Sequence, residues 1–335
     1  MNEIILNKIN QSRLGKDQAG LLGIDWILFT ALIPIIGAGL VTMNAFTGDG
    51  LFFDKQLAWA AFSLIIFLAV SFIDFRFLRR TGVVVTIYLF FISILFATAL
   101  LAVAVKGAQS WIHFGWIAFE PADMAKLVLI ILLSKYFTRR HVEIANIKHI
   151  FVSGLYAFLL FFLIMLQPDF GSAIIVFFIW LGMVFVSGIS KKHLLAVFLV
   201  GITSFAILWV SVFQPYQKQR IANFIHPLAD IRGTGYNAYQ SMIAVGSGEL
   251  FGKGVGYGTQ SRLKFLPEYQ TDFIFAAFAE EWGYIGILIL FSLYGVVIWR
   301  ILANAMNGST NFEILFGMGL AIYFMTHIIL SLIHI

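Results

Sequence analysis

The chain has 335 residues, of which 60% are hydrophobic and 12% are charged, and its mean hydropathy is +0.91. Soluble domains are about half apolar and about a quarter charged, so these values exclude a soluble globular protein and leave a membrane-embedded one. The absence of cysteine excludes disulfides, thiolate metal sites and thiol nucleophiles. A net charge of +5 is modest, and in a membrane protein it bears on orientation rather than on nucleic-acid binding.

Nine apolar runs, most of them near the roughly 20 residues that a membrane-spanning helix needs, predict an all-α, polytopic membrane protein. The run at 272–302 is too long for one straight span, so we expect a bend at Gly283 or Gly286. No repeat or linker divides the chain, which predicts a single membrane domain over 1–335. In chain order, the runs are 22–44, 56–73, 82–105, 122–137, 149–167, 172–189, 193–213, 272–302 and 312–329.

Lysine and arginine accumulate in alternate connections between these runs. The positive-inside rule then predicts a cytoplasmic N-terminus, cytoplasmic loops at 74–81, 138–148 and 190–192, and an external loop at 214–271. Long structured loops are usually functional, and this one carries aromatics, glycines and both signs of charge. Its stretch Gly252–Gly258 lacks the strand and spacing of a P-loop, so we interpret it as a flexible outer loop.

Ionisable residues at membrane depth are costly and are therefore candidates for function. Each also has a structural explanation. Asp25 fits a helix cap or interfacial anchor, Asp169 fits a turn, and Asp123 and Lys126 could pair with each other because they are three residues apart on one helix. The full set is Asp25, Asp123, Lys126, Asp169, Asp272, Glu280 and Glu281.

Asp272 has the strongest local argument, because it stands where the long outer loop re-enters the membrane. The alternative is that Thr271 and Asp272 only cap the following helix. Glu280 and Glu281 are adjacent and point in different directions around that helix, and for Glu280 a structural pairing role is favoured over chemistry.

Two tryptophans lie in the segment Ser110–Trp116, between the third and fourth runs. Trp111 and Trp116 fit an aromatic belt at the membrane interface, and the segment fits a re-entrant or interfacial helix.

Three motifs resemble the SEDS family (shape, elongation, division and sporulation). They are Leu266-Pro267-Glu268 with Thr271–Phe275, the turn Gln167–Gly171, and the run at 240–248. Loop residues 215–220 and 258–261 are more similar to the RodA branch of the family than to the FtsW branch. The resemblance covers about residues 22–329, and it implies nine spans present of an expected ten.

The resemblance implies a peptidoglycan glycosyltransferase that polymerises lipid II at the outer face of the bacterial inner membrane during cell elongation. It also implies a divalent cation (Mg or Mn), a class B penicillin-binding protein as partner, and the elongation machinery. Asp272 matches the family's essential aspartate, as a catalytic group or a metal ligand. The resemblance further assigns substrate binding to Trp111, Lys126, Arg220 and Glu268, and motif roles to Asp169, Glu280 and Glu281.

Some positions depart from the family pattern. Ser110 and Gln270 stand where arginine and histidine are common, and Glu120–Asp123 replaces the usual Gln-Pro-Ser-Glu. The last six residues, 330–335, are compatible with the translated end of a transposon adapter used in sequencing, so we interpret them as an artefact of an incomplete gene. Two rival functions stay open: a flippase or transporter for a lipid-linked sugar, and a non-catalytic scaffold for a penicillin-binding protein.

Overall fold

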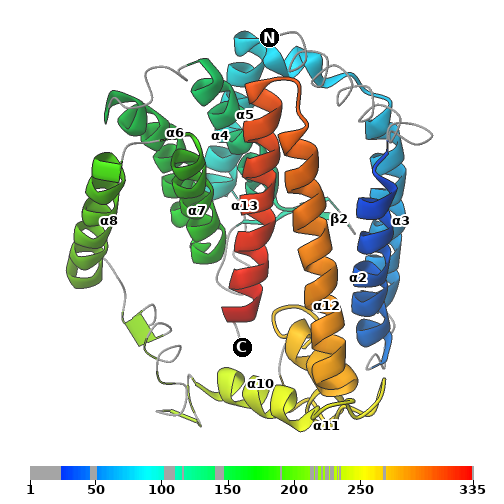
Figure 1. The fold of residues 1–335 in the computed structure, drawn as a ribbon. Coiled ribbons are helices and arrows are strands. Elements are labelled where there is room, and N and C mark those ends of the chain that lie inside the picture. Colours follow the sequence, from blue (N-terminus) through cyan, green and yellow to red (C-terminus); the bar gives the residue numbers. More distant parts are fainter. Residues whose placement is uncertain are drawn as a thin grey trace. The chain divides into compact units, whose positions relative to one another are not determined.

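The computed structural model describes most of the chain from residue 24 to residue 333 (Figure 1). The described residues are 24–45, 51–101, 110–114, 117–139, 147–188, 191–211, 215, 218–219, 222, 226, 230–231, 233, 235–266 and 269–333.

The described residues are mainly helical, as the apolar runs predict, with one short hairpin of two strands. The strands are β1 (Ile112–Phe114) and β2 (Ile117–Phe119). The helices are α2 (Trp26–Ala45), α3 (Leu51–Ser71), η2 (Phe75–Arg79), α4 (Thr81–Leu101), α5 (Pro121–Arg139), α6 (Ile147–Leu166), α7 (Phe170–Val186), α8 (Lys191–Ser211), α10 (Tyr236–Ser247), α11 (Thr259–Arg262), α12 (Ile274–Met306) and α13 (Asn311–Ile333).

Within the described residues, six helices are long and apolar enough to cross a membrane: α2, α3, α4, α6, α12 and α13. Their apolar side chains lie largely on the outside of the protein, and in α3 none of the apolar window is buried. Such a surface suits hydrocarbon rather than water, and helices satisfy their own backbone hydrogen bonds there. The chain is therefore a multi-span membrane protein. The other three predicted runs correspond to α5, α7 and α8, which are shorter or less apolar.

Contacts divide the chain into two compact units, and the predicted single domain stays a prediction. The first unit comprises residues 1–73, 212–300 and 331–335, and the second comprises 74–211 and 301–330.

In the second unit, α4, α5, α6 and α7 pack around one apolar core, and side chains of α13 complete it. Helix α5 contacts α4, α6 and α7, and its Leu129, Ile130 and Leu133 are fully buried. This central position explains why its sequence is short and partly polar, because α5 faces protein rather than lipid. Pro121 and Asp123 in its first turn are typical of a helix start.

In the first unit, α2 pairs with α3, and α10 and α11 lie beside the beginning of α12 (Figure 1). Asp25 caps α2, because its Oδ1 accepts hydrogen bonds from the backbone N–H groups of Ile27 and Leu28 at 3.1 Å. Its other oxygen accepts hydrogen bonds from Arg300 near the end of α12, at 2.8 and 2.9 Å. The start of α2 and the cationic part of α12 are thus held together.

The helix predicted for Ser110–Trp116 is wrong for the described part of that segment. Residues 112–114 form β1, which pairs antiparallel with β2 and places Ile112 opposite Phe119 and Phe114 opposite Ile117. The segment is shorter than an isolated helix needs, and its β-branched and aromatic residues favour a strand.

Candidate functional site

Asp272 lies in the turn just before α12 and is exposed, whereas the next residue, Phe273, is 8% exposed. The Phe273 carbonyl accepts the hydrogen bond from Ala277 N–H at 3.2 Å, so the helix begins after Asp272. Among the described residues, no hydrogen bond or ion pair engages the Asp272 carboxylate. This carboxylate is therefore available to an incoming group.

A small apolar cluster holds the turn that carries Asp272. Its buried members are Ala244 of α10, Leu266, Phe273 and Ala276, and Tyr269 packs against them. Burial raises the pKa of the Tyr269 phenol, to which Gln270 donates a hydrogen bond at 3.2 Å. The turn is thus anchored by this cluster, while the Asp272 side chain is exposed.

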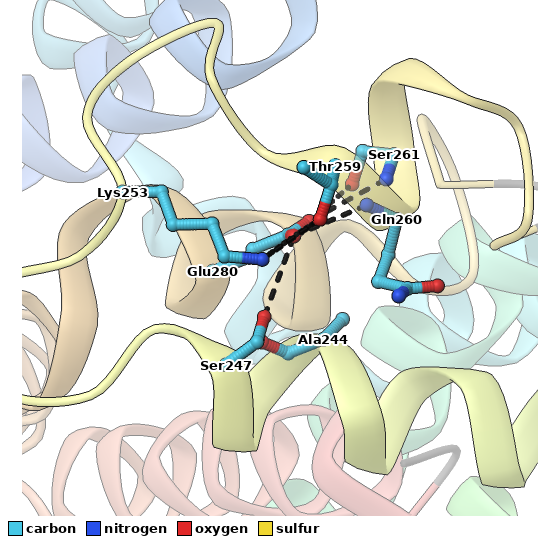
Figure 2. Close-up of polar contacts among 7 residues, drawn as sticks. All are labelled: Ala244, Ser247, Lys253, Thr259, Gln260, Ser261 and Glu280. Carbon is cyan, nitrogen blue, oxygen red and sulfur yellow. Dashed lines mark hydrogen bonds and ion pairs between the residues drawn. The ribbon is translucent and has the colours of Figure 1, made fainter.

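Glu280 lies eight residues further along the chain and has no exposed surface. Its carboxylate accepts six hydrogen bonds from the segment that precedes α12, and one of them is an ion pair (Figure 2). The donors are Lys253 Nζ (2.8 Å), Thr259 Oγ1 (3.1 Å), Gln260 N (3.1 Å), Ser261 N (3.4 Å), Ser261 Oγ (3.4 Å) and Ser247 Oγ (3.4 Å).

Helix α12 breaks at Gly283, one of the two predicted bends, where φ is 66° and ψ is −167°. In an unbroken helix, the carbonyls of Glu280 and Glu281 would accept hydrogen bonds from the N–H groups of residues 284 and 285. Here the 249–254 segment replaces both partners. The two carbonyls accept from the N–H groups of Lys253 (2.9 Å) and Gly254 (3.0 Å), and the freed N–H groups of Tyr284 and Ile285 donate to the carbonyls of Glu249 (2.9 Å) and Leu250 (3.1 Å).

Glu281 binds the same outer segment from the neighbouring position of α12. It is 1% exposed, and its Oε1 accepts a hydrogen bond from the Gly256 N–H at 2.7 Å. The Gly252–Gly258 stretch is therefore held to α12 by side-chain and backbone bonds, and the interpretation of a flexible loop is wrong. Gly252, Gly254 and Gly256 have positive φ angles, which glycine adopts without strain. Gly252 also allows a close backbone contact, because a Cβ there would collide with the Glu281 carbonyl.

The second unit contains a separate charged group at the start of α5 and α7. Lys126 is 1% exposed, and its Nζ donates to Asp123 Oδ1 at 2.8 Å and to Ser172 Oγ at 3.0 Å. Pairing with Asp123 was the structural alternative to substrate binding. The Asp123 side chain of this pair is 49% exposed, and substrate binding by Lys126 stays a prediction.

Asp169 and Glu120 complete this second group. The Asp169 carboxylate caps α7 by accepting a hydrogen bond from the Ser172 N–H at 3.0 Å, and Ser172 Oγ donates to Glu120 at 3.2 Å. Burial and then the nearby carboxylates of Asp123 and Asp169 raise the pKa of Glu120 to about 7, although Lys126 opposes them. The carboxyl groups of Asp123 and Asp169 thus both act on Glu120, and a protonated Glu120 reduces the repulsion among the three.

This raised pKa predicts a pH dependence of stability. A carboxyl whose pKa is higher in the folded than in the unfolded protein stabilises the fold fully below its unfolded pKa, and this contribution is lost as pH rises through the folded pKa of about 7. The apparent Tm of the unmodified protein should therefore fall relative to that of Glu120→Gln between pH 5 and pH 8. Thermal unfolding in detergent checks this, and an unchanged difference would contradict it; Glu249→Gln, at an exposed position, is the control.

The remaining predicted site residues are placed only in part. Trp111 is 41% exposed beside β1, whereas Arg220, Glu268 and Trp116 lie outside the described residues. The substrate-binding roles of Arg220 and Glu268 therefore stay predictions. The sequence analysis did not identify Lys253 or Ser172. For Lys253 the available signal was its place in a glycine-rich stretch, and for Ser172 it was its place in the first turn of a membrane helix.

The described residues include six helices long and apolar enough to cross a membrane, and the buried charged side chains Lys126, Glu280 and Glu281. Together these features define a polytopic membrane protein with internal polar groups. The chain belongs to the FtsW/RodA/SpoVE family of cell cycle proteins, whose model matches residues 20–334. The SEDS resemblance of the motifs is thereby confirmed.

Two curated relatives illustrate the family. The chain is 34% identical to the peptidoglycan glycosyltransferase MrdB of Escherichia coli (strain K12) over 307 residues, which cover 91% of this chain and 82% of the relative. It is also 34% identical to the stage V sporulation protein E of Bacillus subtilis (strain 168) over 278 residues, which cover 82% of this chain and 75% of the relative.

Solved structures share the fold. A chain of a peptidoglycan synthase complex that coordinates polymerization and crosslinking aligns with a TM-score of 0.79 and 25% identity, covering 93% of this chain and 87% of that one. The rod shape determining protein RodA of Thermus thermophilus aligns with a TM-score of 0.67 and 25% identity, covering 92% and 84%.

Proposed function

We propose that this chain is a peptidoglycan glycosyltransferase that polymerises lipid II into glycan strands during cell elongation and releases undecaprenyl pyrophosphate. The observation that carries the proposal is an exposed, unengaged Asp272 in a chain that shares 34% identity over 91% of its length with a glycosyltransferase of the same family.

In the proposed reaction, the 4-hydroxyl oxygen of the acceptor sugar forms a bond to the anomeric carbon of the donor. The bond from that carbon to the pyrophosphate breaks, and the pyrophosphate leaves with the electron pair. The Asp272 carboxylate takes the hydroxyl proton as general base. Its exposed place in the turn just before α12 suits this role, because an incoming hydroxyl can reach the carboxylate there.

A divalent cation, Mg or Mn, is the cofactor we propose. Among the described residues, no group of three His, Asp or Glu side chains forms a ready-made metal cage. A single free carboxylate such as Asp272 fits a cation whose other ligands are water and substrate phosphates, which is how magnesium is usually bound. Such a cation would supply charge stabilisation for the departing pyrophosphate.

We further propose nine spans with a cytoplasmic N-terminus and an active site that faces outward. The Asp25–Arg300 ion pair supports this arrangement, because it holds the start of the first span and the basic end of the eighth on one side. A class B penicillin-binding protein and the elongation machinery are the proposed partners, in line with the synthase complex among the structural neighbours.

The orientation predicts the outcome of cysteine labelling. Since the chain has no native cysteine, single substitutions at 77 and 240 can be labelled in intact cells. We expect a membrane-impermeant maleimide to react at position 240 and to reach position 77 only after the cells are opened. Reaction at 240 only from the cytoplasmic side would reverse the proposed topology.

Polymerisation of lipid II by the purified protein, with no other enzyme present, tests the function. Glycan strands of many disaccharides support a transferase. Movement of lipid II across a vesicle membrane without polymer would support the flippase, and polymer made only by an added penicillin-binding protein would support the scaffold.

A further inference from the structure

The Glu280 carboxylate is fully engaged. It is buried, it accepts six hydrogen bonds, and it pairs with Lys253, so it has no lone pair free to take a proton from a substrate. The group nevertheless binds three separate pieces of the outer segment to α12, and a carboxylate at membrane depth is costly unless it serves such an arrangement.

We propose that Glu280 is a positioning residue for Asp272: it anchors α10, Lys253 and α11 to α12, and thereby fixes the turn that carries Asp272. This inference rests on the proposed function, in which Asp272 is the base.

The first step of the connection runs from Glu280 to α11. The N–H groups of Gln260 and Ser261 belong to the first turn of that helix, where backbone donors have no partner inside the helix. Glu280 supplies both partners, at 3.1 and 3.4 Å. A helix of four residues has little stability of its own, so this carboxylate fixes where α11 lies.

The second step runs from α11 to Asp272. The Gln260 carbonyl accepts a hydrogen bond from the Leu266 N–H at 3.1 Å. Leu266 is fully buried in the cluster that also contains Phe273, the residue next to Asp272. A displacement of α11 therefore pulls on Leu266, and through the cluster it moves the backbone that carries the base.

Lys253 makes the anchor sensitive to charge. Its Nζ lies 2.8 Å from Glu280 Oε1 and also donates to Thr259 Oγ1 at 2.8 Å. Glu280 is fully buried while the Lys253 side chain is 28% exposed, so removing Lys253 alone leaves a buried charge uncompensated, whereas removing both partners is better tolerated. Lys253→Met should therefore impair the anchor more than the double variant Lys253→Met with Glu280→Gln.

The test compares Glu280→Gln, Lys253→Met, the double variant and Glu249→Gln in the purified full chain. Glu249→Gln is the matched control, because its exposed side chain lies in the same segment and accepts no hydrogen bond among the described residues. Two measurements are made: hydrogen exchange of the peptides over 259–273, and kcat and KM for lipid II polymerisation.

We expect Glu280→Gln to speed exchange over 259–273 and to lower kcat by about 10- to 100-fold with KM changed less than about threefold, because a base misplaced by about 1 Å can cost about 100-fold. The double variant should lose less activity than Lys253→Met alone. In an Asp272→Asn background, Glu280→Gln should cost nothing further, because its effect passes through Asp272.

Other results overturn the inference. Faster exchange with unchanged kcat would make Glu280 an anchor that does not position the base, and an additive loss in the Asp272→Asn background would give it an independent role. If Glu280→Gln does not fold, the Lys253 variants carry the same comparison. If the unmodified protein makes no polymer, the proposed function fails, while the exchange data still decide separately whether Glu280 anchors the turn.

Discussion

Replacing Asp272 by asparagine is expected to lower the rate of lipid II polymerisation by about 10²- to 10⁴-fold, the usual contribution of a general base, while the protein stays folded. The amide keeps the size and shape of the carboxylate but cannot accept a proton. Folding should be spared because the side chain is exposed and makes no hydrogen bond within the described residues, so its loss leaves no buried group unsatisfied.

A purified-protein polymerisation assay, together with thermal unfolding, measures both parts of this prediction. Asp54→Asn is the matched control, because Asp54 is also an exposed aspartate near a helix start, in the first turn of α3. We expect that variant to retain the full rate. A loss of less than tenfold in Asp272→Asn at normal expression would remove Asp272 from the chemistry and favour the flippase and scaffold alternatives.

The sequence was sufficient to predict the helices because hydropathy is a local property. The run predicted at 82–105 corresponds to α4 at Thr81–Leu101, and the run at 312–329 corresponds to α13 at Asn311–Ile333. The excessive length of the 272–302 run likewise predicted a break, which is found at Gly283 and not at Gly286. Of these two glycines, only Gly283 has a positive φ, and at that point the 249–254 segment takes the place of the helical hydrogen-bond partners.

The partners of the buried charges could not be predicted, because they depend on contacts between distant residues. Lys253 lies 27 residues from Glu280 in the sequence and meets it only because the glycine-rich segment folds back onto α12. Ser172 similarly reaches Glu120 across 52 residues. The local pattern predicted which residues would need a partner, and Lys126 with Asp123, three apart on one helix, was the one pair it could specify.

The secondary structure of the Ser110–Trp116 segment was also not predictable from its own residues. Its aromatic residues suggested an interfacial helix, yet residues 112–114 form a three-residue strand there. Strand pairing depends on the partner strand Ile117–Phe119, and a window centred on the tryptophans does not include it.

Replacing Gly283 by alanine is expected to destabilise the first unit, whereas the same replacement at Gly295 is not. Its backbone, with φ of 66° and ψ of −167°, lies in a region that is accessible essentially only to glycine, and forcing another residue there costs about 1–3 kcal/mol. The added Cβ would also collide with the backbone of Phe251 and Gly252. Since that backbone is hydrogen-bonded to α12 on both sides of the break, it cannot move away without losing those bonds.

Gly295→Ala provides the control in the same helix, because a Cβ there meets nothing within 4 Å. Alanine is favoured over glycine in a helix interior by about 1 kcal/mol, so this variant should be neutral or slightly more stable. For Gly283→Ala we expect an apparent Tm lower by about 5–10 °C, on the scaling of about 2–4 °C per kcal/mol, and a loss of polymerisation because the segment that anchors Asp272 is displaced. Equal Tm values for the two variants would mean that the 249–254 segment is not held in the break of α12, and the positioning role of Glu280 would then fail with it.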